Sequence, residues 1–219
     1  MRVVEIFDSI DGEGVRVGEL TTFIRLAGCN LRCSYCDTPY ALKCSDGEEM
    51  SINDIVKQAQ DIGYRNITLT GGEPLLMPEA FDLIEALEKA GFYVNIETNG
   101  SRDITKALEY ENVIVTMDYK TPDSGVEKSM RVENFELLRE QDVLKFVVTE
   151  NDLPRVKEII QKYDIQKPYI YLSPVFEKIN PAEIVEFLKE LHKKGVNTNK
   201  IRVQLQIHKY IWHPSKRGV

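Results

Sequence analysis

The sequence lacks a long apolar run, an excess of positive charge and any low-complexity stretch or flexible linker. No apolar stretch approaches the ~18 residues of a membrane-spanning helix, and the start, MRVVEIFD, is charged too early for a signal peptide. The 28 Lys and Arg against 35 Asp and Glu give a net charge of −7, which disfavours broad binding to nucleic acid or to membrane surfaces. We therefore expect a cytoplasmic protein with a small-molecule substrate and no nucleic-acid or membrane partner.

Cysteine is also scarce, with four in 219 residues. Thiols are kept reduced in the cytosol, so these cysteines are better explained as metal ligands or catalytic groups than as disulfides. The length and the 42% of hydrophobic residues suit one α/β domain with one large core, because half-chains would lie near the small end of domain sizes. We predict a single domain over residues 1–219 with a short C-terminal tail.

Short β-rich runs alternate along the chain with segments of helical apolar period. The predicted strands are 21–26, 66–70, 93–97, 113–117, 144–149, 169–173 and 202–207, and the helical periods are 52–59, 81–87, 156–163 and 184–191. Most strands are near-continuously apolar, as expected when both faces are covered, and the alternation predicts βαβ units and a parallel sheet. Six or seven units are too few for a complete eightfold barrel, so we predict an open, partial TIM-like β/α barrel, with a doubly wound sheet as the alternative.

The strongest chemical signal is a C-x3-C-x2-C motif, Cys29, Cys33 and Cys36, which directly follows the first predicted strand. Three thiolates on one tight loop can hold one metal centre. A zinc site completed by Cys44, or a redox pair of Cys33 and Cys36, is the alternative. Zinc sites usually pair two separated C-x2-4-C units, however, and the chain has no second unit. Three ligands on a four-iron cluster would leave one iron open to a substrate or cofactor.

Polar segments follow several predicted strands. They are TGGEP at 70–74, ETNG at 97–100, DYK at 118–120, SP at 173–174 and HK at 208–209. The carboxyl ends of parallel strands meet on one face of a barrel, so we expect these segments to surround one pocket. The paired glycines at 71–72 would let the backbone approach a ligand closely, although the same letters also suit an ordinary turn between a strand and a helix.

The N-terminal stretch suggests the kind of ligand. Gly12 and Gly14 form a tight backbone loop, Glu13 is an acceptor for N–H groups, and Arg25 can clamp a carboxylate with two hydrogen bonds. A heterocycle that carries a carboxylate would satisfy all three. The alternative is a β-hairpin turn with an incidental surface acid.

The cysteine motif matches that of the radical S-adenosylmethionine (SAM) superfamily letter for letter, and TGGEP resembles its SAM-binding GGEP segment. With EIFDSIDGEG at 5–14, ETNG at 97–100 and QIHKY at 206–210, the whole chain resembles the 7-carboxy-7-deazaguanine synthases. The resemblance implies a single radical SAM core domain that converts 6-carboxy-5,6,7,8-tetrahydropterin to 7-carboxy-7-deazaguanine. This ring contraction releases ammonia and belongs to the biosynthesis of queuosine and other 7-deazapurines. A [4Fe-4S] cluster, SAM and Mg2+ would be the cofactors.

The resemblance also implies the residues of the site. The pterin would contact Ile10, Asp11, Gly12, Glu13, Arg25 and Thr70, with Glu13 and Arg25 as the catalytic pair that fixes it. Cys29, Cys33 and Cys36 would hold the cluster, and Thr38 would bind Mg2+. SAM would contact Tyr35, Cys36, Asp37, Gly72, Asp118, Tyr119, Lys120, Ser173, Pro174, Val175 and Phe176.

The chain departs from the family pattern in three places. Many members have Gln at the position of Asp11 and Ser-Pro at the position of Asp118 and Tyr119. Some end near Pro214 and use the terminal carboxylate in the active site, whereas residues 215–219 follow here. The resemblance further implies a homodimer and a flavodoxin or ferredoxin as the reductant.

Two other functions remain open at this point. A glycyl-radical activating enzyme would share the cluster, and Asp118 and Lys120 match its Asp-x-Lys element, but it would need a wide groove for a protein partner. A non-catalytic zinc or iron-sulfur binding protein is the alternative from another class. Its metal content would distinguish it from the enzymes.

Overall fold

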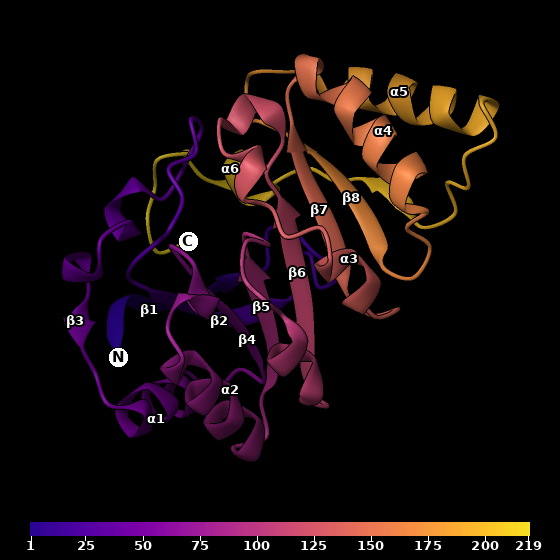
Figure 1. Ribbon diagram of the computed structural model, residues 1–219. Coiled ribbons are helices and arrows are strands. Elements are labelled where there is room, and N and C mark those ends of the chain that lie inside the picture. The colour runs from indigo at the N-terminus through magenta and orange to yellow at the C-terminus, as the bar shows by residue number, and fades with distance from the viewer.

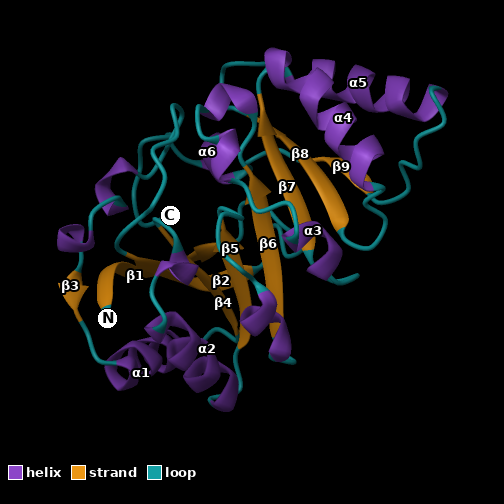
Figure 2. Ribbon diagram, in the orientation of Figure 1, coloured by secondary structure: helices purple, strands orange, loops and turns teal.

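The computed structural model describes residues 1–219, and its centre is one nine-stranded sheet (Figures 1 and 2). The strands are β1 (Arg2–Ile10), β2 (Leu20–Leu26), β3 (Glu48–Glu49), β4 (Asn66–Gly71), β5 (Tyr93–Thr98), β6 (Val113–Tyr119), β7 (Val143–Val148), β8 (Tyr169–Pro174) and β9 (Ile201–Val203). They lie in the order β3-β1-β2-β4-β5-β6-β7-β8-β9. β1 runs antiparallel to β2 and β3, and every other neighbouring pair is parallel.

The parallel strands follow one another across the sheet in chain order from β2 to β9. A doubly wound sheet reverses its strand order at a switch point, so this topology excludes that alternative. The sheet ends in β3 on one side and β9 on the other, and these two edges do not pair. The prediction of an open, partial TIM-like β/α barrel is therefore confirmed.

Four long helices cover the outer face of the sheet (Figure 1). They are α1 (Ile52–Ile62), α2 (Glu79–Lys89), α4 (Leu153–Tyr163) and α5 (Pro181–Lys193). Their ends follow the sequence signals: Ser51 accepts a hydrogen bond from the Asp54 amide at the start of α1, and Gly63 ends α1 with φ +90°. The connections after β5 and β6 hold no long helix: a 3-10 turn (Thr105–Glu109) follows β5, and two more (Pro122–Ser124 and Glu127–Ser129) with the short α3 (Asn134–Leu137) follow β6. None of the helices is long and apolar enough to cross a membrane.

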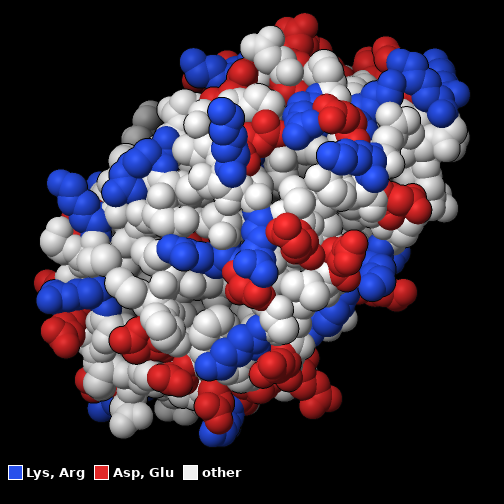
Figure 3. Space-filling model, in the orientation of Figure 1, with Lys and Arg blue, Asp and Glu red and all other residues white.

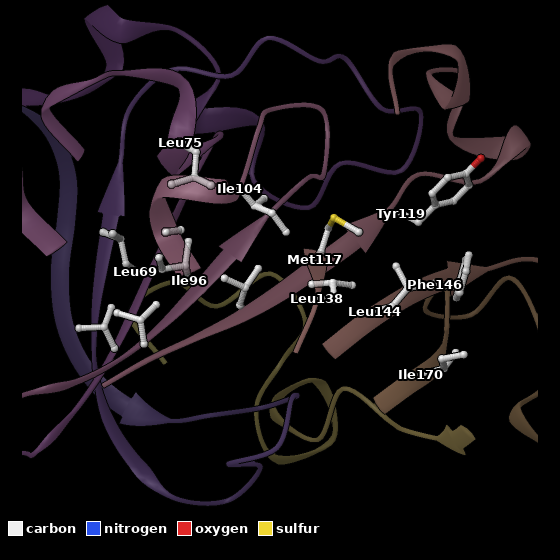
Figure 4. Packing of buried hydrophobic residues seen from close by; sticks show 14 of the residues in the cluster. Leu69, Leu75, Ile96, Ile104, Met117, Tyr119, Leu138, Leu144, Phe146 and Ile170 are labelled. Atoms are coloured by element: carbon white, nitrogen blue, oxygen red, sulfur yellow. The ribbon is translucent and has the colours of Figure 1, made fainter. Parts of the chain in front are cut away.

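The inward face of the central strands carries polar side chains such as Thr70, Asp118 and Lys145 beside apolar ones such as Val147, which corrects the prediction of near-continuously apolar strands covered on both faces. Leu144 and Phe146 of β7 belong to the hydrophobic core between sheet and helices, whereas Lys145 points to the other side and lines a pocket. The same alternation places Leu69 of β4 and Ile96 of β5 in the core (Figure 4). Side chains of a strand alternate between its faces, so one face packs on the helices and the polar face lines the barrel.

The segment 11–19, between β1 and β2, reaches the amino ends of the parallel strands. Arg16 donates hydrogen bonds to the Asn66 side chain (3.2 Å) and to the carbonyl oxygens of Ile67 (2.9 Å) and Tyr93 (3.1 Å). Gly14 exchanges two hydrogen bonds with the Gln204 side chain, which follows β9. The segment thus runs through the barrel: Arg16 covers the amino ends of β4 and β5, while Gly12 and Glu13 line the pocket at the carboxyl ends.

The two ends of the sheet differ from the sequence prediction. β1 was not among the predicted strands, and β9 ends at Val203 instead of continuing to residue 207. The chain leaves the sheet there because the Ile207 amide bonds the Gly12 carbonyl oxygen (3.1 Å), and α6 (His208–Ile211) begins.

The one-sided core predicts a large difference between two leucines of the same sheet. Leu69 is fully buried, whereas Leu20 is 54% exposed. We expect Leu69→Ala to lower the free energy of unfolding by about 2–5 kcal/mol, because it removes buried methyl groups and leaves a cavity. Leu20→Ala, the matched control, should cost under about 1 kcal/mol. Urea unfolding followed by circular dichroism measures both, and equal losses would contradict this description of the core.

Candidate active site

A pocket of about 440 Å3 lies at the carboxyl ends of the parallel strands. Side chains from distant parts of the chain meet in it, among them Glu13, Cys33, Thr70, Asp118 and Lys145. The predicted site residues that line the pocket are Ile10, Gly12, Glu13, Arg25, Cys29, Cys33, Tyr35, Cys36, Asp37, Thr38, Thr70, Gly72, Asp118, Lys120, Val175 and Phe176. The polar strand ends therefore surround one concave site, as the barrel geometry predicts.

The three motif cysteines lie on the loop that follows β2 and line this pocket as free, half-buried thiols. Burial raises the pKa of the Cys29 and Cys33 thiols. The sulfur of Cys29 accepts hydrogen bonds from the Leu31 amide (3.4 Å) and the Asn99 side chain (3.8 Å). No three His, Cys, Asp or Glu side chains lie close enough together to share one metal ion. Three thiols on one loop, with N–H donors on a sulfur, fit the ligand chemistry of an iron-sulfur cluster.

Cys44 is exposed and does not line the pocket. It begins a 3-10 turn (Cys44–Asp46), and its sulfur lies against Gly28, the residue before Cys29. Cys44 is thus near the motif in space but outside the pocket that the three motif cysteines line.

Arg25 is held in place by an acid and two aromatic rings. Its Nε donates to Glu5 Oε1 (2.7 Å), and the Tyr40 hydroxyl donates to the same oxygen (3.2 Å). The guanidinium carbon lies 5.9 Å from the ring centroids of both Phe7 and Tyr40. Its Nη1 and Nη2 make no hydrogen bond to the protein, so this edge can take a carboxylate in two parallel hydrogen bonds.

Glu13 has one engaged and one free oxygen. Oε2 accepts from Lys145 Nζ (3.2 Å) and from Gln206 Nε2 (3.1 Å), while Oε1 is buried without a partner. Burial disfavours the charged form, but Lys145 and the Gln206 amide outweigh it and hold the pKa of Glu13 below its usual range. A buried acceptor without a partner is costly unless a ligand supplies the donor. Glu13 can therefore receive an N–H group of a bound heterocycle.

Asp118 lies beside Glu13 in the pocket, because Lys145 contacts both carboxylates. Lys120 donates to its Oδ2 (2.9 Å), and Lys145 Nζ lies 3.7 Å from the same atom. The Asp118 Oδ1 atom is buried without a partner, so it too can accept a hydrogen bond from a ligand.

Four predicted site residues do not line the pocket: Asp11, Tyr119, Ser173 and Pro174. Tyr119 lies on the outward face of β6, where its ring packs in the core and its hydroxyl donates to Glu127 (3.0 Å). Strand alternation therefore turns Tyr119 away while Asp118 and Lys120 point inward. At the end of β8, Val175 and Phe176 reach the pocket, whereas Ser173 and Pro174 are buried and do not line it.

The Asp11 side chain points toward Arg16, which covers the amino ends of β4 and β5. It accepts a hydrogen bond from Thr68 (2.6 Å), and its other oxygen lies 3.3 Å from Arg16 Nε. Burial raises the pKa of Asp11 to about 7, against the lowering effects of the Thr68 hydrogen bond and of Arg16. The Asp11 carboxylate, which stands where many family members have Gln, therefore contacts Thr68 and Arg16 inside the barrel and does not line the pocket.

The pocket also contains residues that the sequence interpretation left out of the site. Glu97 accepts from the Thr70 hydroxyl (3.1 Å), and burial raises its pKa. Lys145, Gln206 and His208 line the same wall, and an added Cβ on Gly12 would collide with the His208 ring. Lys145 had a visible signal, because it is a lysine inside the apolar run VLKFVV.

The C-terminal tail also reaches the pocket. Val219 lines it, and the guanidinium carbon of Arg217 lies over the Tyr40 ring, 3.6 Å from its centroid. No sequence signal indicates this position of Val219.

Comparison with known proteins relates this site to a chemistry. Residues 23–205 match the sequence profile of the Radical SAM superfamily. The chain is 44% identical to the 7-carboxy-7-deazaguanine synthase of Clostridium acetobutylicum, over 100% of this chain and 99% of that protein. It is 37% identical to the enzyme of the same name from Leptospira interrogans, over 99% and 97% of the two chains. The crystal structure of QueE from Escherichia coli has the same fold, with a TM-score of 0.68, 23% identity and 93% of each chain covered.

The position of Cys44 outside the pocket predicts the metal content of two variants. After anaerobic purification and reconstitution, we expect about four irons per chain in Cys44→Ala and few in Cys33→Ala, because only Cys33 lies with the other two thiols in the pocket. Iron, sulfide and zinc analysis of both proteins measures this. Equal loss in both variants would indicate a four-cysteine site, and about one zinc per chain would indicate a structural metal.

The burial of Asp11 predicts a pH-dependent stability difference. The raised pKa, about 7 against 3.8, means that Asp11 favours the folded state at low pH and that this contribution is lost as pH rises through 7. Asp11→Asn cannot titrate, so its stability relative to the parent protein should rise between about pH 4 and pH 8, by about 1 kcal/mol or more. Urea unfolding of both proteins across this range provides the measurement. A constant difference would show that Asp11 is ionised throughout beside Arg16.

Proposed function

The chain belongs to the radical SAM superfamily and, within it, to the 7-carboxy-7-deazaguanine synthases, and on that premise we propose how its pocket is used. The enzyme is a lyase that converts 6-carboxy-5,6,7,8-tetrahydropterin to 7-carboxy-7-deazaguanine with loss of ammonia, in 7-deazapurine biosynthesis. The proposal for the pocket rests on one observation: two of its side chains have polar atoms with no hydrogen-bond partner in the protein. Arg25 offers an open guanidinium edge, and Glu13 offers a buried oxygen without a partner.

These two groups match the two ends of the substrate. The edge of Arg25 takes the pterin carboxylate, since guanidinium and carboxylate share a bidentate geometry. Glu13 accepts N–H groups of the pterin ring, which are the donors that its free oxygen lacks. Thr70 and the backbone of residues 10–12 complete the substrate site, with Gly12 leaving room for His208. Held at both ends, the pterin keeps one orientation toward the cofactors.

The cofactors occupy the remaining part of the pocket. Cys29, Cys33 and Cys36 hold the [4Fe-4S] cluster, and SAM lies along Tyr35, Cys36, Asp37, Gly72, Asp118, Lys120, Val175 and Phe176. Tyr119, Ser173 and Pro174 contribute to the SAM site through their backbone. When bound, the cluster and SAM would supply radical hydrogen-abstraction chemistry beside the substrate.

Thr38 provides an oxygen ligand for Mg2+. Its hydroxyl lines the pocket and donates to Asp37 Oδ1 (3.1 Å), so two oxygen-bearing side chains stand together there. Mg2+ prefers oxygen ligands and keeps several waters, so few protein ligands are sufficient. Bound near the substrate carboxylate, the ion would help to hold its negative charge.

We further propose that residues 1–219 act as one radical SAM core domain, in which the C-terminal tail lies over the substrate end of the pocket. The contact of Arg217 with Tyr40 supports this place for the tail. The enzyme would work in the cytoplasm as a homodimer and receive electrons from a flavodoxin or ferredoxin. Gel filtration with light scattering would test the dimer.

The proposed substrate site predicts the outcome of a direct assay. Reconstituted enzyme with SAM, Mg2+, dithionite and 6-carboxytetrahydropterin should form 7-carboxy-7-deazaguanine, detected by mass spectrometry. Arg25→Ala should raise KM for the pterin about 10- to 150-fold, since a hydrogen-bonded charge contributes about 1.5–3 kcal/mol. Arg65→Ala, an exposed arginine at the opposite end of the barrel, is the control and should behave as the parent enzyme.

Formation of 5′-deoxyadenosine without this product would contradict the substrate assignment while keeping the radical chemistry. A normal KM in Arg25→Ala would instead contradict only the proposed carboxylate clamp.

A further inference from the structure

Lys145 places a charged group where its strand otherwise carries apolar side chains. Its neighbours Leu144 and Phe146 face the core, whereas its own side chain, 7% exposed, points inside the barrel. The ammonium group lies 3.2 Å from Glu13 Oε2 and 3.7 Å from Asp118 Oδ2. Lys145 thus joins a residue of the proposed pterin site to a residue of the proposed SAM site.

The carboxylates around Lys145 need a positive charge. Glu13, Glu97 and Asp118 all line this wall of the pocket, and burying like charges together is costly unless they are paired and hydrogen-bonded. Lys120 also pairs with Asp118, with its Nζ 2.9 Å from Asp118 Oδ2, but it makes no contact with Glu13. Lys145 is therefore the cation that faces Glu13 at hydrogen-bond distance.

We propose that Lys145 is a positioning residue for the pterin. It binds one oxygen of Glu13, which leaves the other oxygen ionised and directed to the N–H groups of the substrate. Through Asp118 it also fixes Glu13 relative to the SAM site. The proposal rests on the proposed function and adds to it a residue that touches the substrate only through Glu13.

Loss of this ammonium group should raise the pKa of Glu13. The titratable groups that face Glu13 are Lys145 from β7, His208 from α6 and Glu97 from β5. Burial raises the pKa of Glu13, and Lys145 is the largest influence that lowers it. Without Lys145 the pKa rises, so Glu13 becomes protonated as pH falls and regains its charge as pH rises. A protonated Glu13 has lost its role as a charged acceptor.

Pterin binding without turnover tests this inference. The cluster-loaded protein with SAM and no reductant is titrated with the fluorescent analogue 6-carboxypterin at about pH 7 and about pH 9. We expect Lys145→Met to weaken binding at least about 10-fold relative to the parent protein at the lower pH, the effect of one pKa unit or more, and much less at the higher pH. Lys145→Arg keeps the charge and should bind more tightly than Lys145→Met at the lower pH. Lys193→Met, an exposed lysine on α5, is the control and should bind as the parent protein does.

A double-variant cycle separates positioning from general damage to the fold. In a Glu13→Gln background, Lys145→Met should change binding by less than about threefold, because the charge that it supports is already gone. An effect of Lys145→Met that is equal at both pH values, and undiminished in the Glu13→Gln background, would overturn the proposal. If Lys145→Met loses its cluster, Lys145→Gln takes its place in every comparison and is judged by the same two criteria.

The readouts distinguish this proposal from the function on which it rests. Parent protein that binds 6-carboxypterin but forms no 7-carboxy-7-deazaguanine under reducing conditions would contradict the proposed function. Parent protein that forms the product, together with a pH-independent Lys145→Met defect, would contradict the role of Lys145 alone.

Discussion

The alternation of side chains along the parallel strands is the constraint on which the rest of the structure depends. A strand has two faces, and in β4 to β8 the outward face packs on helices and the inward face surrounds the pocket. The same backbone that buries Leu69, Ile96 and Leu144 therefore presents Thr70, Glu97 and Lys145 to the ligands (Figure 4). Stability and chemistry are properties of alternate residues of one strand, so a shift of register by one residue would destroy both.

The inward face is polar enough to need an internal balance of charge. Acidic and basic side chains are mixed over the visible surface of the molecule, where water screens them (Figure 3). Inside the barrel such screening is weaker, and three acids have a defined cationic partner: Arg25 for Glu5, Lys145 for Glu13 and Lys120 for Asp118. The atoms left over are the edge of Arg25 and single oxygens of Glu13 and Asp118. These unpaired atoms are the ones to which we assign the substrate and cofactor contacts of the proposed function.

Much of the site could be predicted from the sequence, and the failures have specific physical causes. The cysteine spacing and the glycine segments are local, so their positions in the pocket follow from the chain alone. Tyr119 was named through the resemblance, which gives a segment and not the direction of each side chain, and its ring lies in the core. Lys145 stands in the run VLKFVV, where the prediction of an apolar strand hid its direction. The direction of Asp11 depends on Arg16 and on Thr68 of another strand, and the return of Val219 to the pocket depends on a contact with Tyr40. Such long-range contacts leave no pattern in the letters.

The position of the cysteine loop directly after β2 has a consequence for how this chain can vary. The side chain of Arg25 lies in the pocket, and Cys29 follows four residues later. Strand β2 is held between β1 and β4 by pairing along its length. The spacing between Arg25 and Cys29 is thus set by the covalent chain and not by a hinge or a domain contact. The number of residues between Arg25 and Cys29 therefore matters as much as their identity. A single inserted residue there would change the distance between the two side chains, although neither side chain itself would be altered.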